Sequence, residues 1–358
     1  MSINNESFIR QCFSLAKKGR GFVSPNPFVG VVIVKNAKII GKGFHKKYGA
    51  AHAEVNAFKN ATENVTGATI FCNLEPCCHT NKQTPPCVPL IISNGIKKVV
   101  ISNLDPNPSV NGKGVKQLQD AGIEVITGVL EDEGKEVNKF YFKFVTEKLP
   151  YITIKIAQSE DGFISKSVNE QTWLTGNEAV KFVHKQRTVY DVVLIGANTV
   201  KVDNPLLTVR EAANRNPIRV IIDGSLSIPL NSKIINSADA EKTWIFTCIN
   251  SDKKKIDELI TAGVKVFQLD SDKNKIDLND ILKKLAEENI TSLFIEGGAD
   301  IFNQFITKKL FDEIIVLQST QKLGNGVAGF DFENAENIKI IKKEKLGNDK
   351  KYLLKKRE

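Results

Sequence analysis

The sequence predicts an α/β protein of two domains. Apolar stretches typical of buried strands alternate along the chain with segments of helical periodicity, and this alternation is characteristic of α/β folds. The 358 residues are also more than one hydrophobic core usually supports, and the pattern restarts around Glu147–Pro150. We therefore expect one domain at residues 1–147 and a second at residues 148–358.

The first half is expected to form a three-layer sandwich of helices around a sheet. Short apolar runs bounded by turn residues predict its strands, and apolar residues at helical spacing predict its helices. The strands are expected at Val29–Val34, Lys38–Phe44, Ala68–Cys72, Lys98–Ser102 and Ile123–Thr127. The helices are expected at Glu6–Lys18, from His52 to about Asn60, after Pro86, and last at Gly114–Ala121.

The second half repeats the alternation and is expected to be a separate α/β unit with its own core. A helix is expected at Gly176–Arg187, between the first two strands. The strands are expected at Tyr151–Ala157, Asp191–Ile195, Ile218–Ile222, Thr243–Thr247, Val264–Phe267, Ser292–Ile295 and Glu313–Leu317.

Two polar stretches of this half directly follow expected strands. Gly196–Pro205 brings polar side chains to the carboxyl end of a strand, where open α/β sheets bind ligands. Ile295–Asp300 contains paired glycines ahead of a helix, which let the backbone approach a phosphate. Arg187 and Arg210 are candidate phosphate contacts, because a guanidinium offers a fork of donors. These features predict a nucleotide- or phosphate-binding domain.

The stretch from His52 to Cys87 in the first half contains residue types that bind metal ions, at characteristic spacings. His52 is followed two residues later by Glu54, then by Pro76-Cys77 and by Cys87, which is the pattern of zinc-dependent deaminases. One imidazole and two thiolates hold Zn²⁺ and leave a fourth tetrahedral position for water, whose pKa the metal lowers toward about 7. Glu54 is expected to carry protons from water to the departing ammonia, because its place on a helix points it away from the metal.

A purely structural zinc site is the alternative reading of the same stretch. It would need a fourth protein ligand, which His79 or Cys78 could supply. The other three cysteines are expected to be buried packing residues: Cys12, Cys72 and Cys248.

Bulk properties exclude several classes of protein. No apolar run approaches the ~18 residues of a membrane span, and the N-terminus lacks the plan of a secretory signal. Six cysteines, three of them close together beside a histidine, indicate a metal site rather than a disulfide scaffold, so we expect a cytoplasmic protein. The net charge of +9 comes from scattered lysines, which we interpret as solvated surface rather than a nucleic-acid site.

Taken together, these motifs resemble the family of bifunctional pyrimidine deaminase/reductases of riboflavin biosynthesis, over essentially the whole chain. In the first half the resemblance is carried by Pro25-Asn26-Pro27, Val29-Gly30, His52-Ala53-Glu54, Leu74-Glu75-Pro76-Cys77, Thr84-Pro85-Pro86-Cys87 and Asp105-Pro106-Asn107-Pro108. In the second half it is carried by Lys155, Ser159-x-Asp161-Gly162, Trp173-Leu174-Thr175, Gly196–Arg210 and Glu296-Gly297-Gly298. The resemblance implies a cytidine-deaminase-like sandwich followed by a dihydrofolate-reductase-like α/β domain.

The resemblance also implies two consecutive reactions on one substrate. The first half would deaminate 2,5-diamino-6-ribosylamino-4(3H)-pyrimidinone 5′-phosphate with Zn²⁺, and the second would use NADPH to give 5-amino-6-ribitylaminouracil 5′-phosphate. A small phosphorylated pyrimidine is then the partner, without nucleic acid or membrane, and the chain would form a homo-oligomer, a dimer or a tetramer.

Site residues follow from the resemblance position by position. In the first half they are His52, Cys77 and Cys87 for zinc, Glu54 for proton transfer, and Asn26, His45, His79, Lys82 and Asp105 for the substrate. In the second half they are Ala157, Trp173, Thr199, Asp203 and Gly298 for NADPH, and Gln171, Arg187, Leu207, Arg210 and Glu296 for the ribosyl phosphate. Lys155 and Asp203 are the candidates for polar assistance at the reduced carbon.

Two features depart from the family pattern. Nine residues separate Cys77 from Cys87, one more than is usual, so either the loop between them bulges or Cys78 is the ligand. Cys77 is favoured because Glu75-Pro76 places it at a strand end. Gln171 and Glu160 stand where the family more often has serine and an apolar residue. Two other hypotheses stay open: a nucleic-acid-editing deaminase, which shares the zinc pattern, and a zinc-stabilised scaffold without activity.

Overall fold

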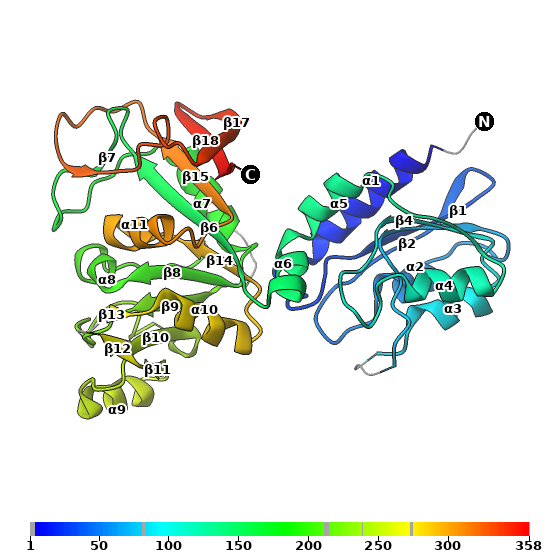
Figure 1. Ribbon diagram of the computed structural model, residues 1–358, viewed down its shortest axis with the longest axis horizontal. Coiled ribbons are helices and arrows are strands. Elements are labelled where there is room, and N and C mark those ends of the chain that lie inside the picture. The colour runs from blue at the N-terminus through cyan, green and yellow to red at the C-terminus, as the bar shows by residue number, and fades with distance from the viewer. Residues whose placement is uncertain (1–3, 81–83, 211–214, 238, 273–274, 358) are drawn as a thin grey trace. The chain divides into compact units, whose positions relative to one another are not determined.

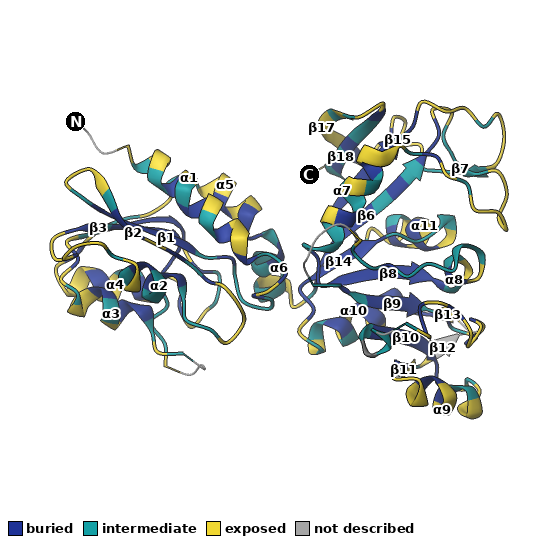
Figure 2. Ribbon diagram, turned by 180° about the vertical axis from the view of Figure 1, so that it is seen from behind, coloured by how far each residue is buried: buried dark blue, intermediate teal, exposed yellow. Residues whose placement is uncertain are grey.

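A computed structural model of the chain describes residues 4–80, 84–210, 215–237, 239–272 and 275–357. It divides into two compact units, Met1–Leu149 and Pro150–Glu358 (Figure 1). Each unit is a sheet covered by helices, and the strands of both sheets are mostly buried (Figure 2). The predicted α/β class is therefore confirmed.

Unit 1 is built on a five-stranded sheet in the order β2-β1-β3-β4-β5. The strands are β1 (Gly30–Lys35), β2 (Lys38–Phe44), β3 (Thr69–Leu74), β4 (Lys98–Asn103) and β5 (Glu124–Ile126). β1 pairs antiparallel with β2 and β3, whereas β3, β4 and β5 run parallel. The carboxyl ends of β3 and β4 therefore meet at one edge of the sheet.

Helices cover both faces of this sheet (Figure 1). They are α1 (Asn5–Ala16), extended by η1 (Lys17–Gly19), α2 (Ala53–Lys59), α3 (Cys87–Ser93), α4 (Lys113–Asp120), α5 (Glu131–Val137) and α6 (Lys139–Glu147). Ile70 and Cys72 of β3 belong to the core that includes α2 and α3, whereas Phe71 between them meets Phe8 of α1 at a ring distance of 4.9 Å. Alternate residues of the strand thus face opposite helix layers, as strand geometry requires.

Two details of unit 1 differ from the expectation. The helix at Gly114–Ala121 is not the last, since α5 and α6 follow β5. α5 was missed because Gly134 interrupts its pattern; this glycine packs against Asn103 of β4, where a Cβ would collide with the Asn103 side chain. In addition, α2 begins at Ala53, so His52 is the N-cap of the helix rather than a residue within it.

Unit 2 contains a nine-stranded sheet in the order β11-β10-β9-β8-β14-β6-β15-β18-β17. Its strands are β6 (Tyr151–Gln158), β8 (Val192–Gly196), β9 (Ile218–Ile222), β10 (Thr243–Cys248), β11 (Lys265–Leu269), β14 (Ser292–Ile295), β15 (Glu313–Gln318), β17 (Ile338–Leu346) and β18 (Asp349–Lys356). Neighbours from β11 to β15 are parallel, and β18 and β17 add an antiparallel edge.

The helices of unit 2 pack around this sheet, and every residue of β8 and β14 is buried. The helices are α7 (Asn177–Arg187), α8 (Ala197–Asp203), α9 (Lys253–Thr261), α10 (Leu278–Glu287), α11 (Ala299–Thr307) and the short η2 (Ala240–Lys242). Two small ribbons pair β7 (Phe163–Ser165) with β16 (Val327–Ala328) and β12 (Ser271–Asp272) with β13 (Lys275–Ile276).

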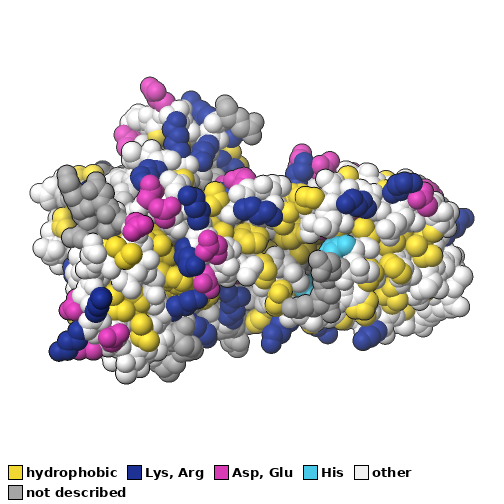
Figure 3. Space-filling model, turned by 60° about the horizontal axis from the view of Figure 1, so that its bottom comes forward, with side chains coloured by type: hydrophobic (Ala, Val, Ile, Leu, Met, Phe, Trp, Pro, Cys, Tyr) yellow, Lys and Arg dark blue, Asp and Glu magenta, His cyan; other side chains and the backbone are white. Residues whose placement is uncertain are grey.

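The distribution of charged side chains can be followed on one face of the molecule (Figure 3). On the face drawn in Figure 3, lysine and arginine side chains are interspersed with acidic and apolar ones and do not form one continuous stripe. Among the described residues, no helix has the length and apolar character needed to cross a membrane.

Candidate active sites

Three metal-ligating side chains converge in unit 1. The Nδ1 of His52 and the Sγ atoms of Cys77 and Cys87 lie within 4.8 Å of one another. Nδ1 is 3.5 Å from the first sulfur and 3.4 Å from the second. One imidazole and two thiolates fit a tetrahedral Zn²⁺ with one position open. The Sγ of Cys78 instead lies 3.8 Å from the carbonyl oxygen of Ser109, so Cys77 is the cysteine positioned beside His52.

The backbone explains why the two thiols meet. Cys77 follows β3, and Cys87 is the first residue of α3. The N–H groups of Cys87 and Val88 donate to the carbonyl of Cys77 at 2.9 and 3.2 Å. First-turn amides have no acceptor within their own helix, so this contact satisfies them while it holds the two cysteines together.

Thr84 orients the imidazole. Its Oγ1 lies 2.9 Å from the Nε2 of His52, which leaves Nδ1 directed at the two sulfurs. A partner on the second nitrogen fixes the tautomer and the ring orientation of a metal-binding histidine. Thr84 was part of a quoted motif, but sequence reasoning assigned it no role.

Replacing this hydroxyl should weaken the zinc site. We expect Thr84→Val to reduce the affinity for Zn²⁺ by about 10- to 100-fold, because the imidazole loses its orienting partner while the side-chain shape is kept. Competition with a chelating dye measures the affinity. Thr80→Val, at an exposed threonine of the same loop, is the matched control. Equal affinity of the Thr84 variant and the wild type would show that Thr84 does not orient His52.

Glu54 lies beside the cluster but outside the set of ligands. It stands in the first turn of α2, two residues after His52, and is only 3% exposed. Burial raises the pKa of its carboxyl, and the negative charge of Cys77 raises this pKa further. A carboxyl group that is buried, close to the metal ligands and able to gain or lose a proton is suited to proton transfer.

Two of the expected substrate residues meet near the cluster. The side-chain nitrogen of Asn26 lies 3.3 Å from the Nε2 of His45, and the His45 ring packs edge-on against His52 with 5.4 Å between centroids. The other nitrogen of His45 lies 3.2 Å from the carbonyl oxygen of Ala51. Burial lowers the pKa of His45, so its neutral form is favoured.

Asp105 is held by Tyr141, which sequence reasoning did not single out, and by Glu75, which was part of a quoted motif but was not expected to contact Asp105. The hydroxyl of Tyr141, from α6, donates to the Asp105 carboxylate at 2.9 Å. The carboxylate of Glu75 accepts from the N–H groups of Asp105, Gly112 and Val115 at 3.2, 3.0 and 3.1 Å, which fixes the loop after β4. Burial raises the pKa of Asp105 to about 6.

The remaining two substrate candidates of unit 1 are less defined. His79 is half-buried, and its Nδ1 is a buried atom without a hydrogen-bond partner among the described residues. Lys82 lies outside the described residues.

Unit 2 contains a cavity of about 970 Å³ at the carboxyl ends of its parallel strands. All the residues predicted for the reductase half line it: Lys155, Ala157, Gln171, Trp173, Arg187, Thr199, Asp203, Leu207, Arg210, Glu296 and Gly298. Trp173 is 72% exposed, which is unusual for so large an apolar ring and fits a surface that a ligand covers.

A charged cluster lies in this cavity. The guanidinium of Arg187 donates two hydrogen bonds to the carboxylate of Glu296, at 2.6 and 3.0 Å, and the Nζ of Lys155 lies 3.7 Å from the same carboxylate. Burial by itself would raise the pKa of Glu296, but the charges of Arg187 and Lys155 outweigh burial and lower it. Burial raises the pKa of Asp203, against the charge of Lys155.

The two glycines after Glu296 have different roles. A Cβ on Gly297 would lie 2.7 Å from the Cβ of Ile301, so this glycine lets α11 pack closely on the sheet. A Cβ on Gly298 would meet no atom closer than the Thr199 Oγ1 at 3.8 Å, and this residue lines the cavity. Both glycines line the cavity, but only at Gly298 would a Cβ be free of close contacts.

Comparison with known proteins covers both units. Residues 2–103 match the family described as cytidine and deoxycytidylate deaminase zinc-binding region, and residues 150–352 match the RibD C-terminal domain. The riboflavin biosynthesis protein RibD of Aquifex aeolicus is 41% identical over 96% of both chains.

Two solved structures also match the whole chain. RibD of Acinetobacter baumannii has a TM-score of 0.89 at 33% identity. A Thermotoga maritima protein has a TM-score of 0.88 at 35% identity, and each match covers 99% of both chains.

The fold and the sites define a bifunctional enzyme, a zinc-dependent deaminase joined to a reductase. Its zinc site consists of His52, Cys77 and Cys87. The identity to RibD of Aquifex aeolicus extends over almost the entire chain, including both halves. The chain belongs to the RibD family of deaminase/reductases of riboflavin biosynthesis.

Proposed function

We propose that the chain deaminates 2,5-diamino-6-ribosylamino-4(3H)-pyrimidinone 5′-phosphate and then reduces the product with NADPH to 5-amino-6-ribitylaminouracil 5′-phosphate. The observation that carries this proposal is the presence in one chain of a His-Cys-Cys cluster beside buried Glu54 and of a charged cavity at the end of a parallel sheet. The Thermotoga maritima protein is named a diaminohydroxyphosphoribosylaminopyrimidine deaminase/5-amino-6-(5-phosphoribosylamino)uracil reductase.

In the first reaction, water replaces an amino group of the pyrimidine and ammonia leaves. Bound zinc supplies a water of lowered pKa at neutral pH. Glu54 takes a proton from the attacking water and delivers it to the departing amino group, a role for which its buried carboxyl beside the cluster is suited. Asn26, His45, His79, Lys82 and Asp105 are proposed to hold the pyrimidine and its phosphate. The positions of His45, which packs against the ring of His52, and of Asn26, which contacts His45, support this role.

In the second reaction, the ribosyl group gains a hydride from NADPH and a proton. Lys155 is proposed to assist at the reduced carbon, because its ammonium lies in the cavity beside Glu296, and Asp203 is proposed to act with it. The other contacts to NADPH are assigned to Ala157, Trp173, Thr199 and Gly298. The contacts to the ribosyl phosphate are assigned to Gln171, Arg187, Leu207, Arg210 and Glu296.

The chain is also proposed to form a homo-oligomer, a dimer or a tetramer. β17 is the edge of the nine-stranded sheet, and its Ile340 and Ile341 are 49% and 46% exposed. An exposed edge strand with apolar side chains is a surface that a second copy can cover. Light scattering of the purified protein tests this assignment; a monomer at all concentrations would contradict it.

One assay tests both reactions. The purified protein is given the diaminopyrimidine ribosyl phosphate and NADPH, and ammonia release and NADPH absorbance are followed together. We expect ammonia to appear first and NADPH to be consumed afterwards, because the reductase acts on the deaminated product. Ammonia without NADPH consumption would contradict the reductase assignment. Neither signal from zinc-loaded protein would contradict the substrate assignment.

A further inference from the structure

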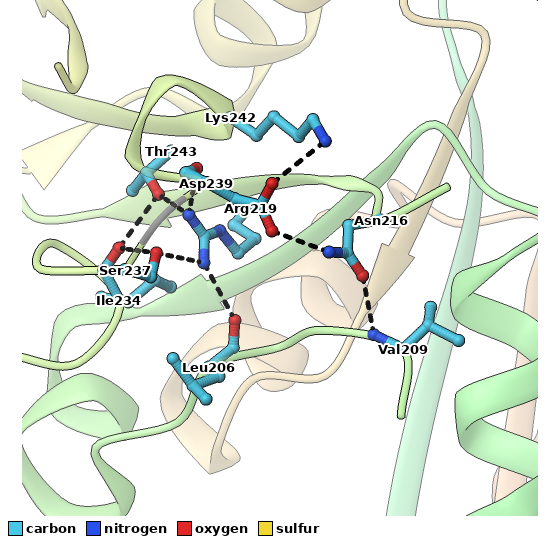
Figure 4. Close-up of polar contacts among 9 residues, drawn as sticks. All are labelled: Leu206, Val209, Asn216, Arg219, Ile234, Ser237, Asp239, Lys242 and Thr243. Carbon is cyan, nitrogen blue, oxygen red and sulfur yellow. Dashed lines mark hydrogen bonds and ion pairs between the residues drawn. The ribbon is translucent and has the colours of Figure 1, made fainter. Parts of the chain in front are cut away.

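A buried arginine outside the charged cluster organises one wall of the reductase cavity. Arg219 lies on β9 and is only 1% exposed. Its Nη1 donates to the carbonyl of Leu206 at 3.2 Å and to the Oγ of Ser237 at 3.0 Å. Its Nη2 donates to the carbonyl of Asp239 at 2.5 Å and to the Oγ1 of Thr243 at 2.6 Å (Figure 4). One guanidinium thus ties the segment before β9 to the segment before β10.

Asn216 adds a second tie between the same two segments. Its Oδ1 accepts from the N–H of Val209 at 2.9 Å, and its Nδ2 donates to the carboxylate of Asp239 at 2.8 Å. Lys242 holds the other oxygen of Asp239 at 3.2 Å. Figure 4 shows both ties, with Leu206 and Val209 at one side and the Asp239 segment at the other.

Part of the segment that these ties hold lines the cavity. Leu206 and Leu207 contribute to the wall, and Leu207 has a φ of 54°, which side chains with a Cβ rarely adopt. From the opposite side, the Nη1 of Arg187 donates to the carbonyl of Thr208 at 3.0 Å. The backbone is therefore held at Leu206, Thr208 and Val209. An unfavourable conformation such as that of Leu207 persists only where surrounding contacts hold it.

We infer that Arg219 and Asn216 are positioning residues of the reductase reaction. They hold the backbone of Leu206–Val209 so that Leu207 and the following Arg210 meet the ribosyl phosphate. This inference rests on the proposed function, because Leu207 and Arg210 are substrate contacts only if that function holds. Neither Asn216 nor Arg219 is among the residues that line the cavity, so the effect passes through the backbone of the segment.

Asn216→Ala is the first test, since Asn216 is only partly buried and its loss leaves Arg219 in place. We expect the KM for the deaminated pyrimidine to rise about tenfold, the factor that corresponds to loss of the one hydrogen bond between Asn216 and the backbone of Val209. The kcat, the KM for NADPH and the rate of deamination should each change less than about twofold. A substrate KM equal to that of the wild type would overturn the inference, and so would parallel increases in both KM values.

Asn236→Ala is the matched control. Asn236 donates to the carbonyls of Leu230 and Ser232, in the same loop region, and does not line the cavity. This variant removes an asparagine amide that also hydrogen-bonds to the backbone but is more exposed than Asn216, so it should leave both KM values unchanged. A tenfold rise in the substrate KM here as well would show a general effect of loosening the loop and would overturn the inference.

Hydrogen exchange gives a readout that does not depend on activity. In Asn216→Ala the Val209 amide hydrogen should exchange about tenfold faster than in the wild type. In Asn236→Ala the same amide hydrogen should exchange at the wild-type rate. Arg219→Lys, which keeps the charge but lacks the planar fork, should also accelerate exchange across Leu206–Val209. Unchanged exchange in both network variants would overturn the inference. If the wild-type protein consumes no NADPH, the proposed function is contradicted instead. The hydrogen-exchange rates alone then show whether Arg219 and Asn216 hold the Leu206–Val209 segment.

Discussion

Replacing Glu54 by glutamine should lower the rate of deamination by about 10³-fold or more, while zinc content and reduction of an already deaminated substrate stay unchanged. A proton-transfer group in the transition state contributes about 10²- to 10⁴-fold, and Glu54 is the buried carboxyl beside the cluster. Glutamine has the same shape but cannot exchange a proton. The ligands are His52, Cys77 and Cys87, so the metal site keeps its full set of donors.

The two reactions of one chain supply the control within each sample. Metal analysis and ammonia release report on unit 1, and NADPH consumption with the deaminated substrate reports on unit 2. Glu63→Gln, at an exposed position of the same half, should behave as the wild type in all three measurements. Undiminished deamination by folded, zinc-loaded Glu54→Gln would remove Glu54 from the mechanism. A zinc-loaded wild type that releases no ammonia would instead support the zinc-stabilised scaffold.

The local parts of both sites were predictable from the sequence. His52, Glu54, Cys77 and Cys87 stand at spacings that the zinc chemistry itself requires, so the motif points to the site without knowledge of the fold. Most strands were also predictable, because a strand buried on both faces is a short continuous apolar run. Ile218–Ile222 and Ser292–Ile295 have the bounds that were expected.

The supporting residues could not be found in this way. Tyr141 reaches Asp105 from α6, a helix whose existence was not expected, and the residues lie 36 positions apart. Arg219 reads in the sequence as one arginine within an apolar strand, and its acceptors are mainly backbone carbonyls and hydroxyls, which leave no motif. Such contacts form only when segments that are distant in the sequence meet in the fold. Sequence patterns therefore identify the metal ligands more readily than the residues that hold site residues in place.

Replacing Glu296 by glutamine should lower the kcat/KM of reduction about 100-fold and leave deamination unchanged. The Glu296 side chain is 6% exposed and stands between the cations of Arg187 and Lys155. Removing its charge leaves two buried cations without their shared partner, and loss of one member of such a pair costs about 2–5 kcal/mol. Steady-state kinetics with the deaminated substrate measure the effect, and 100-fold corresponds to about 2.7 kcal/mol.

A buried carboxylate elsewhere in unit 2 separates the loss of this charge from a loss of stability. Glu313 on β15 is 2% exposed in its side chain and lies 3.4 Å from the Nζ of Lys355, outside the cavity. Glu313→Gln should lower the thermal midpoint of unit 2 about as much as Glu296→Gln does, because both changes remove the charge of a buried carboxylate that is paired with a cation. Its kcat/KM should stay within about twofold of the wild type. If both variants lost reduction equally, Glu296 would act only through the stability of the fold, and the charged cluster would lose its proposed place in substrate binding.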